Sequence, residues 1–250
     1  MDGLQLLIDL HKDAPRQGPG SDDHTALAIT LSGLANQEGI RVADIGCGSG
    51  ASALVLARTL KAHITAVDLL PEFLEELDRT ARSGSFPSTI ETMAASMDCL
   101  PFDDNSVDAI WSEGAIYNIG FDNGIRNWNR FLKPGGILAV YELTWLTADR
   151  PEELERHWLN EYPEVAKASR KIAQLEDAGY TLIGYFPMPP ECWLQNYHRP
   201  MQERFASFLQ RNGNTDQARE IVKAEEAEID LYERFADFVS YGFYIARKAG

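Results

Sequence analysis

An apolar run ends in Asp44 and is followed by three glycines within five positions, Gly46, Gly48 and Gly50. A turn of this kind, from a strand into a helix, leaves backbone N–H groups uncovered at the start of the helix. A ligand can approach them because Cβ atoms are absent. The Asp44 carboxylate could hold a cationic amino group of such a ligand, whereas it would repel a pyrophosphate. This glycine loop therefore predicts a ligand-binding site at the carboxyl edge of a sheet.

The glycines alone leave the nature of the ligand open. Residues 46–51, Gly-Cys-Gly-Ser-Gly-Ala, also satisfy the G-x-G-x-x-G/A pattern of dinucleotide-binding proteins. Asp68 ends the next apolar run, close to where that pattern places an acid that binds ribose. An NAD(P)-dependent oxidoreductase is thus one alternative, a cofactor-binding protein without catalysis is another, and a turn made only for packing is a third.

Short β-rich runs alternate with helical stretches from residue 41 onward, which predicts an α/β fold with helices on both faces of a mostly parallel sheet. Ser21 precedes two acids and is expected to cap a helix. The expected strands are residues 41–45, 63–68, 89–94, 107–112, 136–143, 180–188 and 239–248. The expected organisation is a single domain over residues 1–250, with an N-terminal helical cap at 1–37, a cofactor-binding core at 38–145, and acceptor-side helices with the last two strands at 146–250.

The composition favours a small-molecule partner. The chain has 250 residues, 44% of them hydrophobic, and a formal net charge of −15, which disfavours binding to a phosphate backbone. Its first residues lack the basic region of a signal peptide, and no apolar run reaches the ~18 residues of a membrane span. Three widely spaced cysteines and five scattered histidines predict neither a disulfide framework nor a metal site. We therefore expect a cytoplasmic protein, monomeric or homodimeric, without nucleic-acid or membrane partners.

Four separated blocks give a more specific indication. They are the glycine loop with its acid, Asp68, the segment "MDCLPFDDNSVDAIWSEGAIYNI" (97–119) and the segment "NRFLKPGGILAVYE" (129–142). In this order the chain resembles the class I S-adenosylmethionine-dependent methyltransferases, in the branch that methylates small molecules, over roughly residues 38–145. The resemblance implies a Rossmann-like sheet of seven strands in the order 3-2-1-4-5-7-6, with the last strand antiparallel. It also implies S-adenosylmethionine as the cofactor.

The resemblance further implies which residues contact that cofactor. The glycine loop would wrap the methionine portion, Asp68 would accept both ribose hydroxyls, and Asp98 would accept the adenine amino group. The backbone at residues 97 and 99 would add contacts to the adenine. The complete expected set is Gly18, Gly20, Asp44, Gly46, Cys47, Gly48, Asp68, Leu69, Met97, Asp98, Cys99 and Glu113.

The glycines of this set that precede the sheet come from a Gly-Pro-Gly turn at residues 18–20. Together with the stretch "ECWLQNYHRP" (191–200), it resembles a segment found in a subset of uncharacterised bacterial methyltransferases, in which the turn covers the cofactor. Packing between two N-terminal helices is the alternative role for this turn.

The acceptor side is less defined. A sulfonium methyl group is already electrophilic, so the enzyme mainly has to align the acceptor and exclude water, and no obligatory catalytic residue follows. Glu113, Tyr117 and Glu142 are candidate catalytic residues because they follow the fourth and fifth strands, and Trp145 is a candidate substrate contact. Carbon-methylating relatives often carry histidines near "IYN" (116–118), but this chain has none there. A histidine general base is therefore not expected.

Trp193 and Tyr197 follow a proline-rich break and are four residues apart. On a helix they would share a face, so they could close as a lid over the acceptor. Such an aromatic wall, together with Glu113 or Glu142, would suit an amine or another cationic group. Packing in the core is the alternative for these aromatic residues. The acceptor and the methylated atom stay open at this point.

Overall fold

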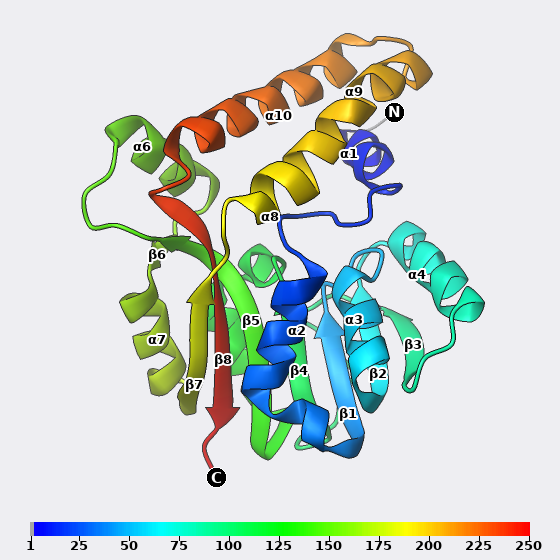
Figure 1. Ribbon diagram of the computed structural model, residues 1–250, viewed down its shortest axis with the longest axis vertical. Helices are drawn as coiled ribbons and strands as arrows, with labels where there is room; N and C mark the ends of the chain where they lie inside the picture. Colours follow the sequence, from blue (N-terminus) through cyan, green and yellow to red (C-terminus); the bar gives the residue numbers. More distant parts are fainter. Residues whose placement is uncertain (1–2) are drawn as a thin grey trace.

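The structure, a computed structural model, describes residues 3–250, which form one central sheet with helices on both faces (Figure 1). Seven long strands lie in the order β3-β2-β1-β4-β5-β8-β7, and β8 is antiparallel to both of its neighbours. Their bounds are β1 Glu38–Ile45, β2 Lys61–Asp68, β3 Thr89–Ala94, β4 Val107–Glu113, β5 Leu132–Trp145, β7 Tyr180–Pro187 and β8 Val239–Lys248. The predicted Rossmann-like order is confirmed.

The sheet differs from the prediction in one strand and in some strand ends. An eighth strand, β6 (Ala166–Lys167), pairs with the end of β5. Its two residues are too few to show a periodic pattern in the sequence. β5 is also longer than expected, because its first residues pair with the start of β4 before a register shift. The expected strands at 89–94 and 239–248 match β3 and β8.

Helices cover the two faces of the sheet through separate apolar clusters. On one face α2 and α3 supply buried residues such as Ala28 and Val55, and α4 packs beside α3 through Leu77. On the other face α5 and α7 supply Trp128 and Leu175. The bounds of these helices are α2 Asp22–Ser32, α3 Ala51–Thr59, α4 Pro71–Ser83, α5 Phe121–Asn129 and α7 Ala168–Asp177.

A helical layer lies above the end of the sheet at which the parallel strands finish (Figure 1). It is built from α1, α9 and α10, which share an apolar cluster containing Leu10, Phe208 and Ile229. The bounds are α1 Gly3–His11, α9 Arg199–Arg211 and α10 Asp216–Phe235, with α6 Glu152–Glu161, α8 Glu191–Trp193 and a π-helical turn at Leu194–His198 beside them. Among residues 3–250, no helix combines the length and apolar character that a membrane span needs.

Residues 12–21 connect α1 in this upper layer to α2 on the sheet, and we call them the strap (Figure 1). The strap ends at Ser21, whose side chain accepts a hydrogen bond from the His24 N–H at 3.2 Å. Ser21 therefore caps α2 as predicted. The strap passes over the carboxyl ends of the strands and forms part of the site described next.

Candidate cofactor and acceptor site

A cavity of about 600 Å³ opens at the carboxyl ends of the central parallel strands. The glycine loop, the end of β2, the loop after β3, the end of β4 and the strap enclose it. It brings together residues that the sequence separates widely, and those predicted for the site that line it are Gly18, Gly46, Cys47, Gly48, Asp68, Leu69, Met97, Asp98, Glu113 and Tyr117. The predicted residues that are not among its lining residues are Gly20, Asp44, Cys99, Glu142, Trp145, Trp193 and Tyr197; Asp44 lies behind the wall, bound to the lining residue Ser52.

The glycine loop is shaped by its own backbone and by the chain around it. Gly46 and Gly48 have φ angles of +74° and +53°, in the left-handed region that favours glycine. A Cβ on Gly46 would overlap the Cβ of Ala115, and a Cβ on Gly48 would overlap the Gln17 side chain. Neighbouring residues of the protein therefore leave no room for a side chain at these two positions. The requirement for glycine does not come from a ligand alone.

Asp44 is a fully buried acid at the end of β1, directly before the glycine loop. Its side chain is fully buried, and its Oδ2 accepts a hydrogen bond from the Ser52 hydroxyl at 2.7 Å. Its Oδ1 has no hydrogen-bond partner among residues 3–250. Burial, with the charges of Glu113 and Asp68, raises the pKa of Asp44 to about 8, although Ser52 and the Arg16 guanidinium act in the opposite direction. An unpartnered buried carboxylate oxygen next to the cavity is suited to bind a cationic donor.

Asp68 is held in place by the backbone. Its Oδ2 accepts from the Gly48 N–H and its Oδ1 from the Leu70 N–H, both at 2.9 Å. Burial raises the pKa of Asp68 in spite of these two hydrogen bonds. Each carboxylate oxygen keeps a further acceptor site, so the oriented carboxylate can accept two hydroxyl groups at the cavity wall.

The far end of the cavity offers an apolar surface beside one acid. Leu69 is 66% exposed, and Asp98 is an exposed acid whose Oδ1 accepts from the Ser96 hydroxyl at 2.5 Å. One backbone group of each of the two neighbouring residues is engaged within the protein. The Met97 carbonyl accepts from the Trp128 indole N–H at 2.9 Å, and the Cys99 N–H donates to the Ser96 carbonyl. Leu69, Met97 and Asp98 line the cavity at this end.

The strap is fixed directly to the glycine loop. The Gln17 amide donates to the Ser49 hydroxyl at 2.8 Å, and its Oε1 accepts from the Ser49 N–H at 2.9 Å. The Tyr141 hydroxyl donates to the Pro19 carbonyl at 2.7 Å. Gly20 donates its N–H to the Cys192 carbonyl instead of facing the cavity. The Gly-Pro-Gly turn thus joins the glycine loop, β5 and α8, and only Gly18 lines the cavity.

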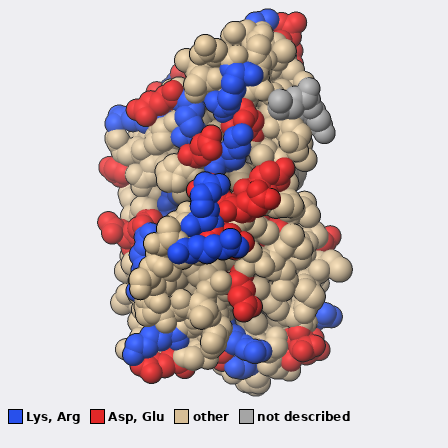
Figure 2. All heavy atoms as spheres, turned by 90° about the vertical axis from the view of Figure 1, so that its right-hand side faces the viewer, with Lys and Arg blue, Asp and Glu red and all other residues tan. Residues whose placement is uncertain are grey.

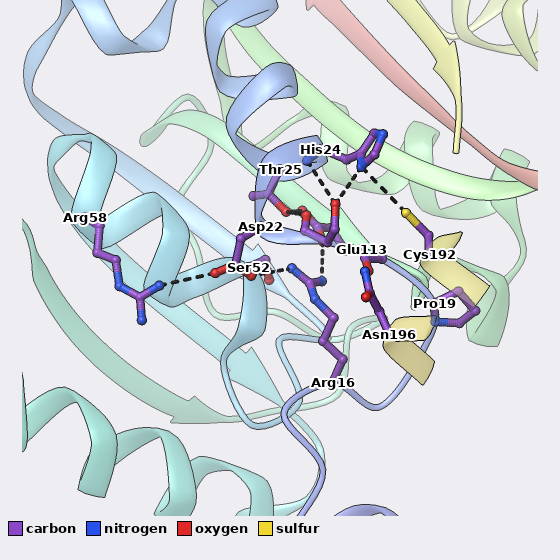
Figure 3. A network of polar contacts seen from close by, with 12 residues as sticks. Arg16, Pro19, Asp22, His24, Thr25, Ser52, Arg58, Glu113, Cys192 and Asn196 are labelled. Atoms are coloured by element: carbon purple, nitrogen blue, oxygen red, sulfur yellow. Dashed lines mark hydrogen bonds and ion pairs between the residues drawn. The ribbon is translucent and has the colours of Figure 1, made fainter. Parts of the chain in front are cut away.

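Glu113, predicted for catalysis and cofactor binding, is bound to other protein groups (Figure 3). Its Oε1 accepts from the Thr25 hydroxyl at 2.7 Å and from the Trp111 indole N–H at 2.8 Å. Its Oε2 accepts from Arg16 at 3.3 Å, and Arg16 also binds Asp22 at 3.0 Å. A carboxylate with three donors is a poor general base, so Glu113 anchors the strap and α2 to the end of β4.

The other acceptor-side candidates lie apart from one another. Tyr117 lines the cavity and is 44% exposed, so it is available to a ligand. Trp145 is 4% exposed and has the Arg150 guanidinium over its ring at 4.3 Å. Its packing in an apolar cluster keeps Trp145 out of the cavity, contrary to the prediction that it contacts the substrate.

Glu142 belongs to a buried polar cluster with Tyr162 and Lys171. Of these three residues, only Glu142 was a candidate from the sequence. Its Oε1 accepts from the Leu143 N–H at 2.7 Å, and its Oε2 has no hydrogen-bond partner among residues 3–250. Lys171, whose side chain is fully buried, donates to the Tyr162 hydroxyl at 3.0 Å. Burial raises the pKa of Glu142, and burial lowers the pKa of Lys171. The sequence around Lys171 is typical of a helix at the protein surface, so the burial of Lys171 could not be predicted.

The expected aromatic lid is wrong for Trp193. Its side chain is 2% exposed, its indole donates to the Ser240 hydroxyl at 3.2 Å, and its ring stacks on Tyr232 at 4.4 Å. The π-helical turn at Leu194–His198 changes the side-chain spacing, so Tyr197 packs with a different apolar cluster from Trp193. The four-residue spacing of an α-helix therefore does not apply to this pair.

A second hollow of about 840 Å³ lies on the outer side of the strap. On the side of the molecule that carries α1 and α4, Lys and Arg side chains form a column with acidic side chains beside them (Figure 2). The four cations that line the hollow are each paired: Lys12 with Asp9, Arg16 with Asp22 and Glu113, Arg58 with Asp22, and Arg79 with Glu76. Each cation that the described residues contribute to the hollow is therefore paired with an acid and is not free to bind an anion.

Comparisons with known proteins agree with this arrangement. Residues 43–140 match the family described as "Methyltransferase domain". The chain is 28% identical over 233 residues to a 27-O-demethylrifamycin SV methyltransferase of Amycolatopsis mediterranei, covering 90% of this chain and 83% of that enzyme. It is 29% identical over 182 residues to a sterol 24-C-methyltransferase of Gibberella zeae, covering 67% of this chain and 47% of that enzyme. The chain thus spans about half the length of the sterol enzyme.

A solved structure shows the same fold. The S-adenosylmethionine-dependent methyltransferase of Geobacter sulfurreducens, in complex with S-adenosylhomocysteine, superposes with a TM-score of 0.79 at 19% identity, covering 97% of each chain. At this identity the likeness concerns the fold alone. The family match covers the glycine loop, Asp68, Asp98 and the end of β4. Residues 43–140 therefore form a methyltransferase domain, and over that core the chain is similar to S-adenosylmethionine-dependent methyltransferases.

Proposed function

We propose that this chain transfers a methyl group from S-adenosylmethionine to a small-molecule acceptor held in line with the sulfonium. The cofactor supplies the electrophilic methyl group when bound. The protein has to hold the cofactor, align the acceptor and keep water away. The relatives named for rifamycin and sterol methylation are consistent with a small-molecule acceptor, and the excess of acidic residues argues against a nucleic acid.

The observation that carries the proposal is the Asp44 carboxylate. Its Oδ1 is buried next to the glycine loop and has no hydrogen-bond partner in the part of the chain that the structure describes, and S-adenosylmethionine carries an ammonium group in its methionine portion. We propose that this ammonium is the partner of Asp44. A dinucleotide would instead bring a pyrophosphate to the same place, which offers no cationic donor to Asp44 and would be repelled by the Asp68 carboxylate.

The other end of the cofactor has a proposed partner as well. Asp68, oriented by the Gly48 and Leu70 N–H groups, would accept the two ribose hydroxyls. Asp98 would accept the adenine amino group, and the exposed Leu69 side chain would cover the adenine ring. Gly18, held over the cavity by Gln17 and Pro19 of the strap, would close the site from above.

We infer that catalysis in this cavity works by alignment rather than by a strong general base. Glu113 is engaged by three donors, and no histidine lines the cavity among residues 3–250. Tyr117, which is 44% exposed, and Asn118 line the cavity after the end of β4. Tyr117 would therefore orient the acceptor against the methyl group.

Calorimetric titration tests the cofactor assignment. The purified chain should bind one S-adenosylhomocysteine and one S-adenosylmethionine, and NAD should give no binding heat. Tight binding of NAD with no binding of S-adenosylhomocysteine would favour the oxidoreductase. Turnover is then measured with radiolabelled S-adenosylmethionine and a metabolite library. Cofactor binding without methylation of any compound would favour a cofactor-binding protein without catalysis.

A further inference from the structure

The charged side chains of the cavity are already engaged by the protein or by the proposed cofactor. Those that line it within residues 3–250 are Arg16, Asp68, Asp98 and Glu113. Arg16 and Glu113 bind each other, and each also binds another side chain of the protein. Asp68 and Asp98 are the acids proposed above for the ribose and the adenine. The described lining therefore keeps no charged side chain for the acceptor.

Exposed apolar side chains form another part of the lining. Leu4 on α1 is 53% exposed, and Tyr117 after β4 is 44% exposed. They are two of the nine large apolar side chains that the described chain exposes, and Leu69, proposed to cover the adenine, is a third. Large exposed apolar groups that gather in one cavity mark a binding surface, since a ligand that covers them removes them from water.

The polar side chains that follow β4 in the lining are uncharged. Tyr117 and Asn118 both line the cavity. The Asn118 amide donates to the Ala115 carbonyl at 2.9 Å, and the Tyr117 ring meets Tyr162 edge-on with 6.2 Å between ring centroids. These contacts hold both side chains in place. A hydroxyl group and an amide can bond to a polar group of a ligand, but they supply no counter-charge.

The acids that the sequence offered to a cationic acceptor are not available for that role. Glu113 accepts from three donors of the protein. Glu142 is buried, lies outside the lining and has the Lys171 charge acting on it. A cationic acceptor would therefore enter without a counter-charge, next to the positive sulfonium of the bound cofactor. An anionic acceptor would enter a cavity lined by three acids. Either ion would lose hydration without compensation.

We propose that the methyl acceptor is an uncharged, largely apolar molecule, whose apolar part covers Leu4 and the Tyr117 ring and whose polar group bonds to Tyr117 or Asn118. This inference rests on the proposed function, because it assigns Asp68 and Asp98 to the cofactor. It replaces the amine that the sequence suggested. Apolar contact thus selects the acceptor, whereas charged groups hold the cofactor.

Three probes that share one naphthalene ring test the charge preference. 2-Naphthol is uncharged at pH 7, 2-naphthoate is an anion and 2-naphthylmethylamine is a cation. Each probe is titrated calorimetrically into the protein saturated with S-adenosylhomocysteine. We expect 2-naphthol to bind at least about tenfold more tightly than either ion, because the ring contacts are the same and only the ions lose the hydration of a charge.

Leu4→Asp places a carboxylate in the apolar part of the lining. The ratio of the 2-naphthol affinity to the 2-naphthylmethylamine affinity should fall at least about tenfold in this variant. Leu159→Asp is the matched control, because Leu159 is a 42% exposed leucine on α6 that is absent from the lining. The control should keep that ratio within about twofold of the parent protein. Tyr117→Ala is a second variant and should weaken 2-naphthol binding about tenfold.

These results decide the inference separately from the proposed function. An ion that binds as tightly as 2-naphthol, no binding of 2-naphthol, or an affinity ratio that changes equally in Leu4→Asp and Leu159→Asp would overturn the uncharged acceptor while cofactor binding stands. A chain that fails to bind S-adenosylhomocysteine at all would overturn the proposed function first. Thermal unfolding of the variants checks that each one is folded, and Tyr117→Ala decides the inference if Leu4→Asp is not.

Discussion

Cofactor binding should release a proton from Asp44. With a pKa of about 8, roughly nine-tenths of the Asp44 carboxyl groups carry a proton at pH 7 in the free protein. The ammonium of S-adenosylhomocysteine requires the ionised form, so binding at pH 7 should release about 0.9 proton per cofactor. For the same reason, affinity should rise about tenfold from pH 6 to pH 7 and level off above pH 8, because protonated Asp44 must first lose its proton.

The assay is calorimetric titration of S-adenosylhomocysteine at pH 7 in buffers with different ionisation enthalpies. The slope of the observed heat against buffer ionisation enthalpy gives the number of protons released. Asp44→Asn keeps an oxygen that accepts from Ser52 but cannot ionise. This variant should release no proton, and its affinity should fall about 10- to 150-fold, as for loss of a hydrogen bond worth about 1.5–3 kcal/mol to a charged partner.

Asp103→Asn is the matched control, since Asp103 is exposed and outside the cavity. It should release as many protons as the parent protein and bind with the same affinity. Proton release that persists in Asp44→Asn, or a parent protein that binds the cofactor with no proton release, would refute the assignment of Asp44 to the ammonium group.

Three further outcomes follow from the same contacts. Asp68→Ala should weaken S-adenosylhomocysteine binding about 10- to 150-fold in calorimetry, and an unchanged affinity would remove Asp68 from the ribose site. Gly48→Val should abolish cofactor binding and also lower the melting temperature, because its side chain would overlap Gln17 at a positive φ; a variant with normal affinity and stability would contradict the loop geometry. Trp193→Ala should cost about 3–5 kcal/mol in denaturant unfolding with cofactor affinity unchanged in the folded protein, and an unaltered unfolding free energy would argue against its place in the core.

Local sequence patterns indicated much of the fold and the candidate residues on the cofactor side of the site. The alternation of strands and helices predicted the α/β fold, the resemblance to a known family supplied the sheet order, and the strand 239–248 could be assigned because it is rich in apolar and aromatic residues. The glycine loop and the acids at 44 and 68 could be recognised because each lies at the end of a strand, where local sequence determines position. The two-residue β6 could not be predicted, since it is too short to show the alternation of apolar and polar residues that marks a strand.

Contacts between distant segments could not be predicted in the same way. Gln17 and Ser49 lie 32 residues apart, and Arg16 and Glu113 lie 97 residues apart, so no spacing rule relates them. Glu113 was assigned to chemistry because of its place after a strand, but its role depends on donors from the strap and α2. Trp193 was placed in a lid by assuming α-helical spacing, and the π-helical turn after it changes that spacing.

The measurement that tests the central claim most directly is a crystal structure of the chain with S-adenosylhomocysteine. The account predicts the cofactor in the cavity of about 600 Å³, with its ammonium within hydrogen-bond distance of Asp44 Oδ1 and both ribose hydroxyls on the Asp68 carboxylate. The adenine should lie between Leu69 and Asp98. A cofactor bound outside this cavity, or bound within it with Asp44 Oδ1 still unpartnered, would contradict the account.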